Sequence, residues 1–423
     1  MIDKNLFLYN LAVAAIFKDE GHYLKEWLDY HLLAGVEHFY LYNNDSSDDF
    51  REVLAPYVKE NLVTLIDWPG KLMQYPAYND TTEKFRFECR YLAFIDIDEF
   101  IFPKSTRSVV EVVDEILSAD PNAAGLAINW QFFGSNGQEK ADYSRGVLER
   151  FTRRAPRHFT EDLPDHKGNA SVKSIINPRR ADYLWNPHFA IYFPSFHAVN
   201  ENGAVVEEHF NEPVTADKIV VNHYFTKSVE EYADKIKRGR SDIITERSWE
   251  SFKAHDRNDE FDDGILKYRV VRAKNFSFES ESDRINRVVN SLVQTLTKNF
   301  SAESLEGELE TFLTCRALAG VLRRSYPKDS RGRFMEEAAL RALNRTHFTR
   351  MTFAEIMMML NALPQILVLP YPIVKNIHQN CLNFVRQLLN DFQRAARWDR
   401  FVEAGNYFEL LAAFNATIKT GDD

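Results

Sequence analysis

This chain of 423 residues has few cysteines, no long apolar runs and no excess of basic residues. Its three cysteines, Cys89, Cys315 and Cys381, are too few and too far apart for a disulfide framework or a zinc site. A reducing compartment fits this cysteine content best. The formal net charge of −10 argues against a general nucleic-acid-binding protein.

No stretch of the sequence is apolar for long enough to cross a bilayer. The apolar segment 6–17 does not have the pattern of a signal sequence, because Asp3 precedes it and Lys18-Asp19-Glu20 stands where a small-residue cleavage site would be. The apolar segment 364–374 is short and is broken by three prolines. We therefore expect a cytoplasmic protein without a transmembrane segment, and peripheral membrane contact is left open.

A glycine-rich phosphate-binding loop is missing as well. The first predicted strand is followed by Phe17-Lys18-Asp19-Glu20, with no glycine before Gly21, so neither a Walker loop nor a dinucleotide-binding fingerprint is present. This argues against an NTPase, an NAD-dependent enzyme and a nucleotidyltransferase. A diphosphate bound here would instead be held through a metal ion.

The first hundred residues alternate between strand and helix patterns. This βαβαβ order predicts a doubly wound, mainly parallel α/β sheet with right-handed crossovers. Shorter strand-like segments between residues 147 and 223 predict antiparallel additions beside that sheet. The predicted strands are 11–17, 38–42, 63–67, a strand beginning at 91, 125–133 and 219–223, and the predicted helices are 23–33, 51–60, 81–90, 109–117 and 229–238.

The character of the sequence changes beyond about residue 270, where amphipathic helix patterns replace strand patterns. We expect an α/β domain over residues 1–265 and an α-helical domain over residues 266–423. The helical half offers no cluster of residues with obvious chemistry, and a protein partner could bind there. Its predicted helices are 284–295, 308–324, 333–343, 353–360, 377–394 and 398–414.

The segment Tyr91–Pro103, YLAFIDIDEFIFP, combines an apolar run with carboxylates. Alternation along a strand would project Asp96 and Asp98 to the same side, at the carboxyl end of a buried strand. Two like charges in an apolar setting are costly unless a cation neutralises them, which favours Mg²⁺ or Mn²⁺ shared with a substrate phosphate. The alternative is an exposed strand end whose acids face water, but the apolar pattern resumes at residues 100–102.

Polar residues also follow the first two predicted strands. The carboxyl ends of parallel strands meet at one edge of the sheet, so these residues are expected beside Asp96 and Asp98 and could bind a nucleobase and ribose. Taken singly, Asn and Asp are also ordinary loop residues. The residues predicted to bind the nucleoside are Phe17, Asp19, Glu20, Asn43, Asn44 and Asp45.

A set of segments in consistent order resembles the glycosyltransferase family 92-like group of GT-A glycosyltransferases. The segments are AIFKDEGHYLKEWLDYHLLAGVEHFYLYNNDSSDDF, LAFIDIDEFIFP, INWQFFGSNG, KSI and NHYFTKSVEEYADKIKRG, within residues 11–245. The resemblance implies a GT-A fold, a nucleotide-sugar donor and a DxD metal site at Asp96 and Asp98. It also implies that His223 completes the metal site, whereas the residues alone favour a hydrogen-bonded core histidine.

The remaining predicted roles concern the diphosphate, the sugar and the proton. Lys227 and Arg238 belong to a basic group after His223 and could reach the diphosphate, although most charges on such a helix are solvated. Trp130 and Gly134 could contact the donor or acceptor sugar, or could be core. Glu149, in a strand-like stretch, is the first candidate for the catalytic base, with Asp142, Glu207 and Glu208 as alternatives.

Together these features predict a metal-dependent glycosyltransferase, of the inverting type, that moves a hexose from a UDP-sugar to a glycan or glycolipid acceptor. A nucleotidyltransferase on a related fold is the first alternative. The second is a non-catalytic sugar-binding or scaffold protein, against which the intact Asp96, Asp98 and His223 argue.

Overall fold

The computed structural model describes residues 4–160, 167–193, 195–242, 247–274, 276–277 and 279–297, together with the single positions 315, 320 and 322. The chain divides into one compact unit over Phe7–Arg284 and a second formed by Met1–Leu6 with Ile285–Asp423. The predicted helices beyond residue 300 lie outside the described residues, apart from those single positions. Among the described residues no helix has both the length and the apolar character needed to cross a membrane.

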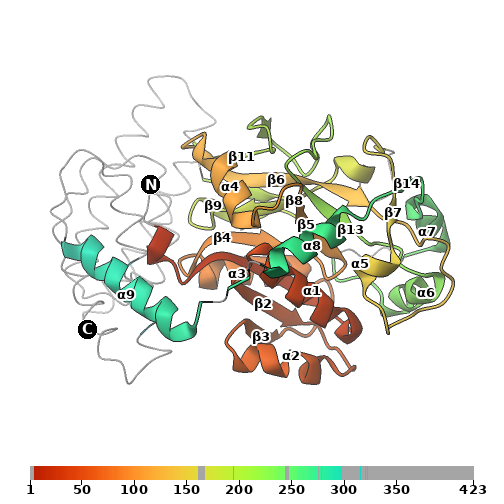
Figure 1. The fold of residues 1–423 in the computed structure, drawn as a ribbon, viewed down its shortest axis with the longest axis horizontal. Coiled ribbons are helices and arrows are strands. Elements are labelled where there is room, and N and C mark those ends of the chain that lie inside the picture. The colour runs from red at the N-terminus through yellow and green to blue at the C-terminus, as the bar shows by residue number, and fades with distance from the viewer. Residues whose placement is uncertain are drawn as a thin grey trace, which may run out of the picture. The chain divides into compact units, whose positions relative to one another are not determined.

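Four parallel strands form the first half of the main sheet, in the order β3-β2-β1-β4 (Figure 1). This confirms the predicted α/β fold with a mainly parallel sheet. One helix was predicted too late in the chain, at 81–90, because Cys89 already pairs with Tyr9 as part of a strand. The elements are β1 (Tyr9–Phe17), α1 (Gly21–Ala34), β2 (His38–Asn43), α2 (Phe50–Lys59), β3 (Val63–Asp67), α3 (Gln74–Phe85) and β4 (Cys89–Phe94).

Helices cover both faces of these strands. Leu11 and Val13 of β1 share one apolar core with Trp27 of α1. The alternate residues of the strands face the other way, where Tyr78 of α3 packs on Phe94 of β4 with ring centroids 5.0 Å apart. The period-2 pattern of the strands thus places one helix layer on each side of the sheet.

The second half of the sheet is mixed. β8 (Val172–Ile176) lies between β4 and β6 (Ala123–Phe132) and is antiparallel to both. The expectation that such strands lie beside the main sheet was wrong for β8, all five residues of which are buried within it. The other elements are η1 (Lys4–Leu6), β5 (Glu99–Pro103), α4 (Val109–Ser118), α5 (Val147–Arg150), β7 (Arg153–Arg154), η2 (Gly168–Ala170), β9 (Ala181–Leu184), β10 (Ala190–Tyr192), β11 (His197–Val199), β12 (Val205–Val206), β13 (Ile219–His223), α6 (Val229–Arg238), α7 (Trp249–His255), β14 (Glu260–Phe261), α8 (Gly264–Lys274) and α9 (Glu281–Thr297).

The acidic segment is two strands rather than one. β4 ends at Phe94 and β5 begins at Glu99, because β5 leaves the main ladder to pair antiparallel with β13. The turn between them carries Asp96 and Asp98. Trp27 fixes this turn by donating its indole N–H toward the carbonyl oxygens of Glu99, at 2.9 Å, and Asp96, at 3.1 Å.

The α/β unit continues past the predicted boundary at residue 265. Ile265 and Tyr268 of α8 are buried, and the ring of Tyr268 lies 5.7 Å from that of Phe102. Arg272 donates a hydrogen bond of 2.8 Å to the carbonyl of Leu33 at the end of α1. The apolar face of α8 therefore belongs to the core of the unit that ends at Arg284.

α6 has its predicted bounds and is anchored by a buried ion pair. Ser228 and Glu231 form a capping box at its start. The two terminal guanidinium nitrogens of Arg150, Nη1 and Nη2, donate to Glu231 at 2.9 and 2.7 Å, and both side chains are about 1% exposed. Burial raises the pKa of Glu231, but the hydrogen bonds from Arg150 and Ser228 lower it overall, from 4.5 to about 2.

We expect Glu231→Gln to lower the free energy of unfolding by about 3–5 kcal/mol at pH 7, because it leaves the buried Arg150 guanidinium without its counter-ion. Since the folded-state pKa of Glu231 is depressed, its contribution is complete above about pH 4.5 and is lost as the pH falls toward about 2. Urea denaturation between pH 7 and pH 3 measures both effects. The matched control is Glu230→Gln. Because the Glu230 side chain is exposed, this variant should change the free energy of unfolding by less than about 1 kcal/mol. Equal losses of unfolding free energy in the two variants would contradict the anchoring role of Glu231.

Candidate functional site

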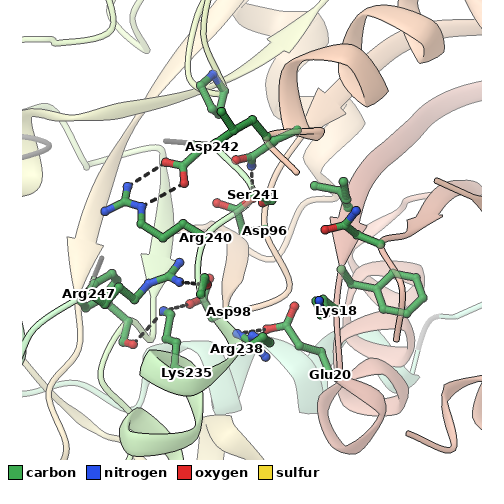
Figure 2. Close-up of a pocket in the computed structure, with 18 of the residues that line it drawn as sticks. Lys18, Glu20, Asp96, Asp98, Lys235, Arg238, Arg240, Ser241, Asp242 and Arg247 are labelled. Carbon is green, nitrogen blue, oxygen red and sulfur yellow. Dashed lines mark hydrogen bonds and ion pairs between the residues drawn. The ribbon is translucent and has the colours of Figure 1, made fainter. Parts of the chain in front are cut away.

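A cavity of about 920 Å³ opens at the carboxyl ends of β1, β2 and β4. Figure 2 shows charged side chains from α6, from the segment after it and from the β4–β5 turn converging on this cavity. Among the described residues of its wall, basic ones outnumber acidic ones, although the whole chain carries a net charge of −10. The basic residues are Lys18, Lys71, Lys235, Lys237, Arg238, Arg240 and Arg247, and the acidic ones are Glu20, Asp96, Asp98 and Asp242.

Asp98 is held by two groups that come from later in the chain. Lys235 of α6 places its Nζ 2.6 Å from Asp98 Oδ2, and His223 at the end of β13 places its Nε2 3.5 Å from Asp98 Oδ1. The Asp98 side chain is 7% exposed. Burial raises its pKa, but Lys235 and then His223 lower it to well below the usual value, so Asp98 is ionised.

Asp96 has a separate set of partners. Lys173 of β8 places its Nζ 2.9 Å from Asp96 Oδ2, and Gln74 and Tyr78 of α3 donate to Asp96 Oδ1 at 2.8 and 3.2 Å. Lys173 also lies 3.3 Å from Glu99 Oε2. Burial lowers the pKa of Lys173, but the charges of Asp96 and Glu99 raise it overall, so this buried ammonium group stays charged.

The residues around Asp98 fit a divalent cation that is shared with a phosphate. Burial lowers the pKa of His223, which keeps its imidazole neutral and able to act as a ligand. Two ligand atoms 3.5 Å apart, as Asp98 Oδ1 and His223 Nε2 are, can both bind one ion at about 2.1 Å. The described residues contain no group of three acidic, histidine or cysteine side chains arranged around one metal position, so phosphate and water oxygens would complete the shell.

Two unsatisfied atoms support this fit. His223 Nδ1 and Glu99 Oε1 are buried without hydrogen-bond partners among the described residues, and they lie 3.9 Å apart. A metal-bound imidazole usually donates its other N–H to such a carboxylate. Glu99 is therefore positioned to orient His223, and the register of β5 on β13, which pairs Glu99 with His223, explains why.

The ends of the first two strands contribute only part of the predicted nucleoside site. Phe17, Glu20 and Asn44 line the cavity, and Arg238 Nη2 lies 3.1 Å from Glu20 Oε1. The other three predicted residues are absent from its wall and brace the neighbouring loops. Asp19 Oδ1 accepts from Ser47 N at 2.6 Å, Asn43 Nδ2 donates to Asp67 at 2.9 Å, and Asp45 Oδ2 accepts from Gly70 N at 3.1 Å.

The predicted sugar and diphosphate contacts also separate into two groups. Trp130 and Arg238 line the cavity. Gly134 does not, and a Cβ at this position would collide with the carbonyl oxygen of Arg257, so its lack of a side chain serves packing. Lys227 lies outside the wall as well, with its Nζ 4.4 Å from the ring centroid of Tyr23.

Glu149 lies elsewhere. The strand predicted around it was wrong, since residues 147–150 form the short helix α5. Its carboxylate accepts from Arg269 at 2.9 Å and lines a second cavity, of about 320 Å³.

Several residues of the first cavity, and the buried partners of its carboxylates, had no role predicted from the sequence. Lys173 lies in the segment KSI, which carried the resemblance, but nothing in the sequence connected it to Asp96. Lys235 and Arg240 lie in the basic stretch that follows His223, but no partner for either could be inferred from the sequence. No local signal pointed to six other residues of the wall, Gln74, His188, His209, Asp242, Arg247 and His255, or to Tyr78, which donates to Asp96 from behind the wall.

The sequence profile of glycosyltransferase family 92 matches this chain over residues 11–256. A family 92 protein of Ricinus communis is 26% identical over 239 residues, which cover 54% of this chain and 38% of that protein. A family 92 protein of Oryza sativa subsp. japonica is 30% identical over 173 residues, which cover 40% of this chain and 29% of that protein. The matched region thus spans well under half of these relatives' length.

Two further matches are weaker. The galactan beta-1,4-galactosyltransferase GALS2 of Arabidopsis thaliana is 29% identical over 100 residues, covering 21% of this chain and 19% of that protein. Among solved structures, S. aureus TarS 1–349 in complex with UDP is 12% identical with a TM-score of 0.31, over 84% of this chain and 91% of that one.

We expect Lys173→Met to lower the free energy of unfolding by about 3–5 kcal/mol at pH 7, because Asp96 and Glu99 then share a site with no cation. Carboxylates left in this state have a raised folded-state pKa, so the loss should shrink as the pH falls and they take up protons. Urea denaturation at pH 5 and pH 8 measures this difference. Lys218→Met, at an exposed lysine before β13, is the control; a loss that is equally small in both variants would contradict the role of Lys173.

Proposed function

The chain belongs to glycosyltransferase family 92, and on that premise we propose that it is a metal-dependent, inverting glycosyltransferase. The donor is a nucleoside diphosphate sugar, with UDP-sugars favoured, and the acceptor is a glycan or a glycolipid. The cofactor is Mn²⁺ or Mg²⁺.

One observation carries this proposal. A cavity whose described wall is rich in lysine and arginine lies at the carboxyl ends of the parallel strands, and Asp98 and His223 also line it. Ligands of open α/β sheets bind at this edge. The described part of the wall has seven basic and four acidic side chains, and this balance on an acidic protein suits a ligand with several negative charges, such as a diphosphate.

The roles of the side chains follow from their positions. Asp98 and His223 would hold the divalent cation, which when bound neutralises charge that develops on the leaving diphosphate. Arg238 and Arg247 line the cavity and can donate to phosphate oxygens. Phe17 and Asn44, at the ends of β1 and β2, are suited to the nucleoside.

Galactose is the sugar to test first, because two relatives are named galactan beta-1,4-galactosyltransferases. A nucleotidyltransferase remains the alternative enzyme, and it would turn over a nucleoside triphosphate. A scaffold protein would bind neither class of nucleotide.

We expect calorimetry to detect UDP binding by the wild type that strengthens in the presence of Mn²⁺. His223→Gln and Asp98→Asn should each weaken UDP binding in Mn²⁺ by about tenfold or more, because each removes one ligand of the cation. In both variants the UDP affinity measured with Mn²⁺ should be close to the UDP affinity measured in metal-free buffer.

Glu149→Gln serves as the control, since Glu149 lines the other cavity, and its UDP affinity should stay within about twofold of wild type. Thermal melting run in parallel identifies variants that fail to fold. UDP binding that is unaffected by Mn²⁺, Asp98→Asn and His223→Gln would contradict the proposed metal site. A folded wild type that binds no UDP at all would contradict the proposed donor.

A further inference from the structure

Every carboxylate in the described wall of the first cavity already has a cation beside it. A carboxylate oxygen that is held by an ammonium or guanidinium group must give up that ion pair before it can take up a proton. None of these carboxylates is therefore well suited to accept a proton from a substrate. The pairs are Glu20 with Arg238 at 3.1 Å, Asp96 with Lys173 at 2.9 Å, Asp98 with Lys235 at 2.6 Å and Asp242 with Arg240 at 2.7 Å.

The wall also contains four histidines, His188, His209, His223 and His255. Three of them are unsuitable as a base for separate reasons. His223 faces Asp98 at 3.5 Å. His255 is only 2% exposed, with its ring packed against Phe225 at 4.3 Å and Phe132 at 5.2 Å, so its ring nitrogens are poorly accessible to a substrate. His209 has a buried Nδ1 without a hydrogen-bond partner among the described residues, so no bond orients its ring.

His188 is different, because one nitrogen is fixed and the other is available. Its Nδ1 lies 3.0 Å from the carbonyl oxygen of Val172. A carbonyl can only accept, so Nδ1 carries the proton and Nε2 of the neutral ring is an acceptor. His188 lines the cavity. Its Nε2 does not belong to the buried, unpartnered side-chain atoms of the described residues, which fits a nitrogen that is open to the cavity.

The position of His188 relative to the metal site is suitable for glycosyl transfer. The ring centroid of Trp130 lies 4.9 Å from that of His188 and 4.5 Å from that of His223. Both imidazoles therefore pack against the same indole, one of them beside Asp98. A sugar whose diphosphate is held at Asp98 would have its reacting carbon within the same part of the cavity.

We propose that His188 is the general base of the transfer reaction. Its Nε2 accepts the proton of the acceptor hydroxyl as the hydroxyl oxygen bonds to the anomeric carbon of the donor. The bond from that carbon to the diphosphate oxygen breaks, and its electron pair leaves with the diphosphate. The imidazolium then gives its proton to water. This inference rests on the proposed function and adds to it the residue that activates the acceptor.

The surroundings of His188 keep its ring neutral. Burial lowers its pKa to well below 6.5, and the charge of Lys173 acts in the same direction. The carbonyl of Val172 and the more distant Asp242 oppose this, while His209 adds to the lowering. A neutral imidazole is the active form of a base, so activity should persist at neutral pH and fall as acid protonates the ring.

The hairpin β9–β10 that carries His188 also offers a surface to the acceptor. Trp185 is 51% exposed, and its ring lies 6.0 Å from that of His209 in the cavity wall. Exposed aromatic faces bind sugar rings well. An acceptor sugar placed on Trp185 would approach the cavity from the side where His188 stands.

The test measures UDP release from UDP-galactose, or from whichever UDP-sugar the wild type turns over, with galacto-oligosaccharides as acceptor. The variants are His188→Ala, His188→Gln and His197→Gln, the last a histidine paired with Asp120 outside the cavity. We expect both His188 variants to lower kcat by about a hundredfold or more, with the Kd for UDP within about threefold of wild type. Added imidazole should restore part of the activity of His188→Ala, and His197→Gln should behave as wild type.

Three outcomes would overturn the inference alone. They are a kcat of the His188 variants within about threefold of wild type, a loss of kcat matched by an equal loss of UDP affinity or thermal stability, and an acid limb of the pH–rate profile that is unchanged in His188→Gln. A folded wild type that binds no UDP and releases none from any UDP-sugar would instead overturn the proposed function, and this inference with it.

Discussion

The neutralisation of three neighbouring carboxylates is the constraint on which the rest of this structure depends. Asp96, Asp98 and Glu99 lie within four residues of one another, where the chain turns from β4 into β5. Burying such charges together is unfavourable unless cations and hydrogen bonds compensate them. Burial, together with the charges of the two aspartates, raises the pKa of Glu99 to well above its usual value despite Lys173, so Glu99 takes up a proton more readily than an ordinary glutamate. Lys173 forms ion pairs with Asp96 and Glu99, and Lys235 forms one with Asp98. The two lysines come from different elements, Lys173 from β8 within the sheet and Lys235 from α6, which follows β13 in the chain.

The same arrangement separates the two aspartates chemically. Asp96 is enclosed by Lys173, Gln74 and Tyr78, all fixed by the fold. Asp98 shares its oxygens between a lysine and a neutral histidine, and the histidine has a second carboxylate behind it. Two residues that look equivalent in the sequence thus have different surroundings, and only one of them is paired with a side chain that prefers metal ions.

The sequence predicted what depends on local pattern. The spacing of apolar residues within 9–67 indicated the strands and helices of the parallel half of the sheet. β13 and α6 have their predicted bounds. Asp98 and His223 came together as the family resemblance implied. What failed depends on pairing between distant segments: β5 separates from β4 because it pairs with β13, and nothing local distinguishes that break from a continuous strand. For the same reason Lys173 and Lys235 could not be matched to their carboxylates, and His188, in a loop without periodicity, gave no signal.

The pairing of Asp98 with Lys235 has a consequence for how the protein is made. The two residues are 137 positions apart in the chain, whereas Asp96 and Lys173 are 77 apart. During synthesis the N-terminal βαβαβ unit leaves the ribosome with its acidic turn uncompensated, since domains form as their segments emerge. The first lysine arrives with β8, and the second only when α6 has followed. Assembly of the cavity is therefore a late event, and the acidic turn favours completion of the α/β unit over any stable half of it.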